Sequence, residues 1–211
     1  MYKWLLNIVF LLCTTLYTGH VAAGDGPSGE IFELHIGKKV YKVELDKPFT
    51  IRSPRKGRLK ATLKRQETLT YSGNGIQFNY HHEMKISTES QMGVTTVTAE
   101  STASPLCIVQ VYNIPISPSE VEKILVASLE KEFANRKADF MKGSGAQVKV
   151  KVGGVRRTGK KLDFLLAGQR FNARVFTFKK GKSVIAVMVQ HDLEDSALAN
   201  KYFSVILESL K

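Results

Sequence analysis

The sequence has few cysteines, which limits how the fold can be stabilised. Only Cys13 and Cys107 occur among 211 residues. Cys13 lies in an apolar segment that we expect to be removed, so one cysteine would remain. A lone cysteine cannot form an internal disulfide, and stability must come from a hydrophobic core. Because Cys107 lies in the apolar run Leu106–Tyr112, we expect a small buried residue rather than a reactive thiol.

Long hydrophobic runs are also lacking. A membrane-spanning helix needs about 20 consecutive apolar residues, and the main apolar stretch, Trp4 to Leu16, is shorter. Lys3 precedes this stretch and Val21-Ala22-Ala23 follows it, a pattern typical of a secretory signal peptide. We therefore expect residues 1–23 to be a signal peptide and residues 24–30 a flexible linker. The mature protein would be exported, periplasmic or secreted, without a transmembrane segment.

The motifs of common catalytic and ligand sites are missing as well. There is no Gly-x-Ser-x-Gly motif, and Cys107 has no evident histidine partner, so nucleophilic hydrolysis has no candidate residues. Gly154–Lys160 has the spacing of a phosphate-binding loop. However, Lys161 replaces the Ser or Thr that would hold Mg²⁺, and a strand rather than a helix is expected to follow. We expect no nucleotide site, no cofactor and no enzymatic activity.

One histidine and one glutamate are the candidates for metal-assisted chemistry. In the alternating strand that begins at Ile76, His81 and Glu83 share the polar face, whereas His82 points to the opposite, core-facing side. An imidazole and a carboxylate on one face could begin a metal site or an acid–base pair, although two such residues often occur by chance and a solvated strand face is the simpler explanation. The alternative function is therefore an envelope-acting enzyme with His81 and Glu83 as candidate metal ligands.

The remaining sequence predicts many short antiparallel strands and two helices. Ser117-Pro118-Ser119-Glu120 is a capping box with proline at the first helical position, and the helix is expected to run from Pro118 to near Met141. A second helix, capped by Asp192 or Asp195, has an apolar stripe that includes Tyr202 and Phe203. The fold class is therefore α+β, a largely antiparallel sheet with two main helices packed on it and an added N-terminal β layer.

Strand patterns add detail to this architecture. Ser183–Val189 has no polar residue after its first and is expected to be a central strand covered on both faces. Leu59, Ala61 and Leu63 alternate with basic residues and Thr62, which predicts a strand with one buried face. In the region from residue 147 to 152, valine alternates with lysine in the same way.

The order of elements resembles the PsbP-like superfamily. The resemblance rests on Gly75-Ile-Gln-Phe-Asn-Tyr80, the capped helix at Ser117, the meander to Met188 and the closing helix that ends Val205-Ile-Leu-Glu-Ser-Leu210. This α/β/α sandwich occurs in photosystem II extrinsic subunits, a nuclear Ran-release factor and bacterial envelope proteins such as DcrB. The resemblance implies a non-catalytic binding or accessory role and transfers no site residues.

The resemblance also sets the expected domain boundaries. We expect a single α+β domain over residues 31–211. Within it, residues 31–72 would form the added β-hairpin layer and residues 75–211 the PsbP-like core.

Positive charge is the strongest functional signal. The chain has 31 Lys and Arg against 19 Asp and Glu, a net charge of +12. Basic clusters are expected in turns and loops, where they can gather at an end of the sandwich. The candidate polyanion-binding residues are Arg55, Lys56, Arg58, Arg156, Arg157, Lys160, Lys161, Lys179, Lys180 and Lys182.

Such a surface attracts an anionic polymer, a lipid headgroup or an acidic protein of the envelope. Nucleic acid is not expected as the partner, because the compartment is wrong and no aromatic-interleaved strand accompanies the charges. Charge that only keeps the protein soluble is the simpler explanation, and like charge also favours a monomer. The expected function is that of an exported binding or accessory protein that acts through a basic surface or a protein partner.

Overall fold

The computed structural model describes residues 31–44, 47–53 and 57–211. The predicted signal peptide and linker, together with Arg55 and Lys56, lie outside the described residues. The chain divides into two compact units, with the boundary between Glu67 and Thr68. The boundaries predicted for a single domain over residues 31–211 stay a prediction, and each unit is described by itself below.

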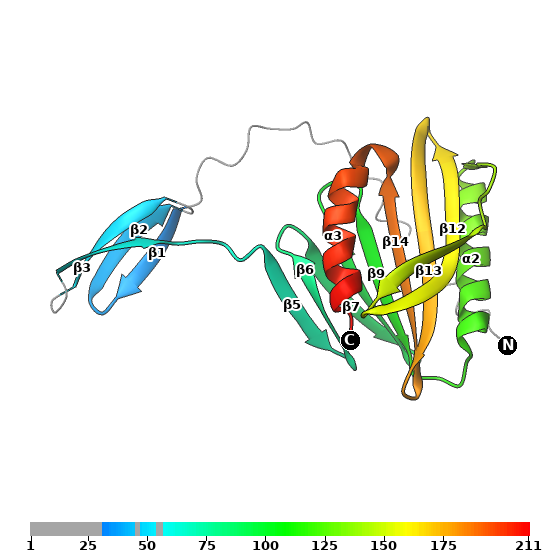
Figure 1. Ribbon diagram of the computed structural model, residues 1–211, viewed down its shortest axis with the longest axis horizontal. Coiled ribbons are helices and arrows are strands. Elements are labelled where there is room, and N and C mark those ends of the chain that lie inside the picture. Colours follow the sequence, from blue (N-terminus) through cyan, green and yellow to red (C-terminus); the bar gives the residue numbers. More distant parts are fainter. Residues whose placement is uncertain (1–30, 45–46, 54–56) are drawn as a thin grey trace. The chain divides into compact units, whose positions relative to one another are not determined.

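The N-terminal unit contains two β-hairpins (Figure 1). One pairs β1 (Ile31–Ile36) with β2 (Lys39–Glu44), and the other pairs β3 (Pro48–Ser53) with β4 (Gly57–Thr62). Val43 is buried, but the prediction of a buried face on β4 is wrong, since Leu59 is 40% exposed. The reason is that a two-stranded sheet has too little area to bury either of its faces well.

The C-terminal unit is organised by an eight-stranded antiparallel sheet (Figure 1). Its strand order is β10-β12-β13-β14-β9-β8-β7, and β11 pairs with the part of β12 that lies beyond β10. A separate hairpin pairs β5 with β6. The strands are β5 (Thr68–Gly73), β6 (Ile76–His81), β7 (Lys85–Gln91), β8 (Val94–Glu100), β9 (Leu106–Tyr112), β10 (Asp139–Phe140), β11 (Gln147–Val152), β12 (Val155–Leu166), β13 (Gln169–Lys180) and β14 (Ser183–Asp192).

The predicted central strand is confirmed. β14 pairs with β13 on one side and β9 on the other, and its residues are almost all buried. Ile185 and Val187 face a core cluster that includes α3 (Ser196–Ser209), whereas Val184 and Ala186 face a second cluster that includes α2 (Pro118–Asn135). The fold class is thus α+β, with one helix on each face of an antiparallel sheet.

The two helices begin where the sequence indicates, but α2 ends earlier. The Ser117 and Glu120 capping box is present with both of its hydrogen bonds. α2 ends at Asn135, and the prediction of a helix to near Met141 is wrong. Lys137 adopts a left-handed conformation (φ 62°), and the Ala138 N–H donates to the Phe133 carbonyl (2.9 Å). This reversal satisfies the last carbonyls of the helix and stops it.

The two aspartates predicted to cap the last helix, Asp192 and Asp195, have different roles. Asp192 accepts a hydrogen bond from the Glu194 N–H and caps the short 3₁₀ turn η2 (Leu193–Asp195). Asp195 occupies the N-cap position of α3, but its side chain accepts from the Ser104 N–H instead (3.0 Å). Asp195 therefore joins the start of α3 to the loop before β9.

We expect Phe203→Ala to lower the free energy of unfolding by about 3 kcal/mol, because the change leaves a cavity in a packed core. Phe203 is 6% exposed and meets the His191 ring edge-on at 5.8 Å. Urea denaturation measures the loss, and Ser204→Ala on the exposed side of α3 is the matched control. A loss below about 1 kcal/mol would contradict the packing of α3 described here.

Candidate functional site

The β11–β12 hairpin forms the first candidate site. β12 pairs with β13 only from Gly159 onward, and its first residues continue beyond the sheet with β11 (Figure 1). This free part of the hairpin lies against the end of α3, where the Gly153 N–H donates to the Leu207 carbonyl (2.7 Å). Val148 and Val150 pack against the core cluster that contains α3. The valines therefore face inward, as their alternation with lysine predicts.

The other face of this hairpin is basic. The strand register places Lys151 directly opposite Arg156 and Lys149 directly opposite Thr158. Lys149, Lys151 and Arg156 are exposed, whereas the Lys160 ammonium is half-buried and donates to the Gly145 carbonyl (3.1 Å). No acidic residue occurs from residue 147 to residue 161. We call Lys149, Lys151, Arg156 and Lys160 the basic hairpin face.

The expectation that these basic residues lie in loops is wrong. Arg156 to Lys161 are all within β12, and strand alternation turns Arg156 and Lys160 to one face and Arg157 and Lys161 to the other. The Arg157 guanidinium lies over the Phe178 ring, 4.3 Å from its centroid. Lys161 forms an ion pair with Asp163 (2.6 Å). Arg157 and Lys161 therefore have partners within the fold.

The second basic segment lies where β13 turns into β14. Lys179 and Lys180 end the strand rather than lie in a loop, and Lys182 lies in the turn. The Lys180 ammonium donates to the Gly75 carbonyl. The Arg157 guanidinium packs on the ring of Phe178, which lies next to Lys179. The β13–β14 turn therefore lies at the same end of the unit as the β11–β12 hairpin. Arg58 belongs to β4 of the N-terminal unit and is exposed.

A hollow of about 460 Å³ lies beside the β13–β14 turn. Lys180 is its one titratable lining group, and the Ser183 hydroxyl at its wall donates to the Asn113 side-chain carbonyl (2.6 Å). Such a lining can hold an anion or a hydroxyl group, but it offers no carboxylate or imidazole for acid–base chemistry. The lining residues are Asn74, Gly75, Val111, Asn113, Lys180, Gly181, Ser183 and Ile185.

Two glycines of the phosphate-loop spacing have structural roles. Gly154 has φ +79° in the β11–β12 turn. A Cβ atom on Gly159 would lie 2.1 Å from the Val175 carbonyl oxygen and 2.5 Å from the Phe176 ring. Gly159 is thus where β12 can approach β13 closely. Both glycines are explained by the chain path.

The histidine pair is arranged differently from the prediction. β6 ends at His81, and His82 and Glu83 lie in the turn before β7, so the expected single strand through Ile86 is interrupted. His81 is buried at 2% exposure, and His82 is partly exposed, the reverse of the predicted orientation. Because the turn cancels strand alternation, the two imidazole rings lie side by side, with centroids 4.6 Å apart. The local pattern could not show where β6 ends.

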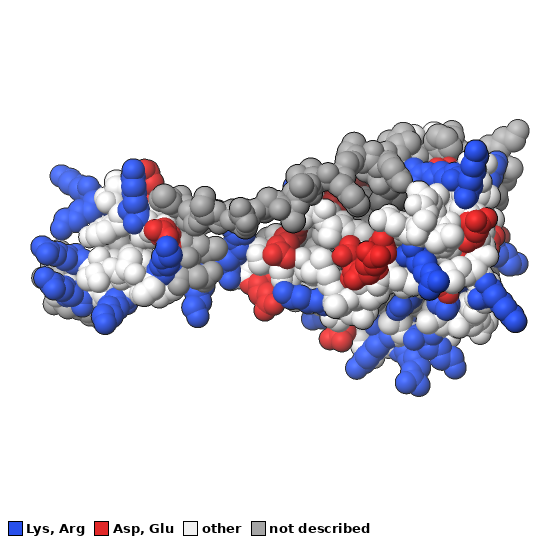
Figure 2. Space-filling view, turned by 90° about the horizontal axis from the view of Figure 1, so that it is seen from above, with Lys and Arg blue, Asp and Glu red and all other residues white. Residues whose placement is uncertain are grey.

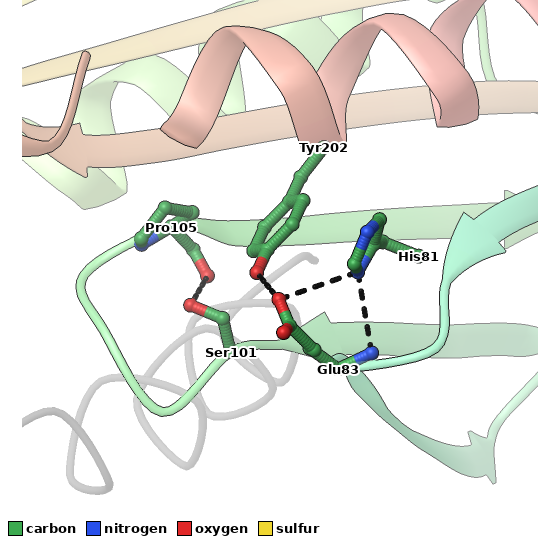
Figure 3. Close-up of polar contacts among 5 residues, drawn as sticks. All are labelled: His81, Glu83, Ser101, Pro105 and Tyr202. Carbon is green, nitrogen blue, oxygen red and sulfur yellow. Dashed lines mark hydrogen bonds and ion pairs between the residues drawn. The ribbon is translucent and has the colours of Figure 1, made fainter. Parts of the chain in front are cut away.

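Glu83 connects this turn to α3. Its Oε2 atom accepts a hydrogen bond from the Tyr202 hydroxyl and lies 3.4 Å from His81 Nδ1 (Figure 3). The Tyr202 ring packs on the His81 ring with centroids 4.7 Å apart. The hydrogen bond from Tyr202 lowers the pKa of Glu83, with smaller contributions from His81 and His82, and burial raises the pKa of Tyr202. The sequence indicates Glu83 as a candidate beside His81, but it marks Tyr202 only as a core residue of the last helix. No local signal shows that the Glu83 and Tyr202 side chains meet.

Cys107 is buried, as predicted, and burial raises the pKa of its thiol to about 12. A thiol with so high a pKa stays protonated at neutral pH and is a poor nucleophile. Among the described residues, no helix is long and apolar enough to span a membrane.

We expect Tyr202→Phe to reduce the pH dependence of stability in the acid range. Because the folded-state pKa of Glu83 is lowered below its ordinary 4.5, its ionisation stabilises the fold above that pH, and this contribution is lost as the pH falls through the lowered value. Urea denaturation at pH 6 and pH 3 should show a larger difference between wild type and Tyr202→Phe at pH 6. Tyr80→Phe is the control, and an equal difference at both pH values would contradict the role of Tyr202.

No protein-family model and no curated protein matches the sequence. Among solved structures, a protein from Bacteroides thetaiotaomicron matches with a TM-score of 0.45 at 11% identity; the match covers 69% of this chain and 48% of that chain, so this chain spans about half its length. Cyanobacterial PsbP (CyanoP) from Synechocystis sp. PCC 6803 matches with a TM-score of 0.48 at 12% identity, covering 69% of this chain and 92% of that chain.

LpqN, which is involved in cell envelope biogenesis of Mycobacterium tuberculosis, matches with a TM-score of 0.40 at 11% identity, covering 68% of this chain and 89% of that chain. A PsbP protein, the family that the sequence resembles, is thus among the similar structures. At these identities the likeness concerns the fold alone.

Proposed function

We propose that the protein is an exported, non-catalytic binding protein that engages an anionic polymer of the cell envelope through the basic hairpin face. The observation that carries the proposal is the position of Lys151 directly opposite Arg156 on the exposed side of the β11–β12 hairpin, with Lys149 two residues away. Three exposed cations lie together there, and no acidic residue occurs between residues 147 and 161.

The position of Lys151 opposite Arg156 lowers the stability of the hairpin unless an anion is bound. Like charges directly opposite each other on antiparallel strands destabilise the pair. A bound polyanion would remove this repulsion, so that binding and hairpin stability favour each other. Charge that serves only solubility is spread over the surface with both signs mixed. Figure 2 shows a group of Lys and Arg side chains at the lower edge of the C-terminal unit, while other Lys and Arg side chains are interspersed with Asp and Glu over the rest of the face in view.

The spacing suits a polymer better than a single small anion. Residues two apart on one strand lie about 7 Å from each other, and directly opposite residues lie about 5 Å apart. Lys149, Lys151 and Arg156 therefore present a row of charges on an exposed strand surface rather than a closed pocket. A chain that carries a negative charge every few ångströms can contact all three.

The enzyme alternative has less support. The hollow at the β13–β14 turn contains Lys180 as its titratable group, and the imidazole and carboxylate groups of His81 and Glu83 lie at the opposite end of β6 from Gly75. The five residue steps of β6 from Ile76 to His81 span roughly 16 Å. The hollow and the acid–base pair are therefore too far apart to act on one substrate bond.

The proposal is tested by binding to heparin, a sulfated polysaccharide that serves as the probe, across a series of salt concentrations. We expect a triple variant, Lys149→Gln, Lys151→Gln and Arg156→Gln, to bind about tenfold or more weakly at low salt and to show a smaller salt dependence. Wild-type protein should also retain anionic polymer from native envelope extract and release it at moderate salt.

The control variant has the same net charge. It carries Lys85→Gln, Lys123→Gln and Lys131→Gln, three exposed lysines on β7 and α2. Equal losses in both triple variants would mean that net charge alone drives binding, and the proposal would be wrong. Selective retention of anionic vesicles would instead identify a lipid headgroup as the partner. Capture of one protein that stays bound at high salt would identify a protein partner.

A further inference from the structure

We propose that His81, His82 and Glu83 bind a divalent transition-metal ion, with zinc as the best match, and that Tyr202 positions the carboxylate. This site is separate from the basic hairpin face and does not depend on the function proposed above. Within the part of the chain that the structure describes, these residues are the one group of three His, Cys, Asp or Glu side chains whose ligand atoms all lie within 4.8 Å of one another.

The distance between the first two ligand atoms fits a tetrahedral ion. His81 Nδ1 and Glu83 Oε2 are 3.4 Å apart. Two ligands on a tetrahedral Zn²⁺ ion, each bonded at about 2.1 Å, are separated by roughly 3.4 Å. The same distance also suits an ion pair with a protonated imidazole. The spacing is therefore compatible with a metal ion between the two atoms, and the third ligand distinguishes this pair from a simple ion pair.

The electrostatics of the pair also favour a cation. The Glu83 N–H donates a long hydrogen bond to His81 Nδ1 (3.4 Å), so this nitrogen presents its lone pair to the turn, and a bound ion would have to replace that hydrogen bond. Oε2 accepts a hydrogen bond from the Tyr202 hydroxyl (Figure 3). Two acceptor atoms that face each other repel unless a proton or a metal ion lies between them. A divalent ion would bind both at neutral pH, where histidine is mostly neutral.

The third ligand is available only because β6 ends at His81. On a continuous strand His82 would point to the opposite face, but in the turn its ring lies beside the His81 ring. His81 is buried, while the Glu83 side chain is 54% exposed, so the site has one closed and one open side through which an ion can enter. Two imidazoles and one carboxylate, completed by water, are typical of zinc rather than of calcium or magnesium.

Tyr202 supplies a hydrogen bond to a ligand side chain, as residues around metal sites usually do. Its hydroxyl holds the Glu83 carboxylate from α3, and its ring packs on His81. Groups that orient a ligand in this way typically affect metal affinity 10- to 100-fold. A bound ion would therefore fix the turn after β6 to the last helix.

The test uses untagged, chelator-stripped full-length protein titrated with zinc chloride by calorimetry, with Co²⁺ absorption as the spectroscopic check. We expect one equivalent of zinc, a rise in melting temperature with zinc, and weaker binding at pH 5.5 than at pH 7.5 as the imidazoles become protonated. Glu83→Gln keeps an acceptor for Tyr202, and we expect it to weaken binding at least about tenfold, with a similar or larger loss in His82→Ala.

The matched control is His35→Ala. His35 and Glu33 are also two residues apart on a strand, with 3.6 Å between His35 Nε2 and the Glu33 carboxylate, but no third ligand lies near them among the residues that the structure describes. His35→Ala should leave zinc binding unchanged. No stoichiometric zinc in wild type, undiminished binding in both Glu83→Gln and His82→Ala, or a loss in His35→Ala would each overturn the proposal. Circular dichroism of each variant verifies that the fold is retained.

Discussion

The burial of β14 on both of its faces is the constraint on which the rest of the structure depends. An antiparallel strand with apolar residues on both sides needs a covering layer on each, and α2 and α3 supply these layers. The strand also pairs along its length with β13 and β9. The positions of the other strands, and of the last helix that carries Tyr202, follow from this arrangement.

The sheet determines where its charged residues lie. β12 is longer than its pairing with β13, and the excess forms a hairpin with β11 that lies against the end of α3. One face of that hairpin therefore packs on the core, and its basic residues must face solvent. Lys151 and Arg156 end up opposite each other. This juxtaposition costs stability by itself, and it is the feature that a polyanion partner would explain.

The turn after β6 shows a different effect of tertiary structure. It brings two histidines and a glutamate together and presents them to a tyrosine of α3, 119 residues later in the chain. This cluster and the basic hairpin face share no residue. The two proposed sites would therefore differ in ligand chemistry, and substitutions in one leave the residues of the other unchanged.

The sequence alone determined the local features: the capping box at Ser117, the two-sided burial of β14, the Val and Lys alternation in β11, and hence the α+β class. These depend on neighbours within a few residues. Only the tertiary structure decided where helices and strands end and which strands pair. Lys137 reverses α2, β6 stops at His81, and Arg156 to Lys161 form strand rather than loop. The limits of β6 and β12 depend on their pairing with other strands, and α2 ends at a left-handed residue. Hydrophobic periodicity records neither.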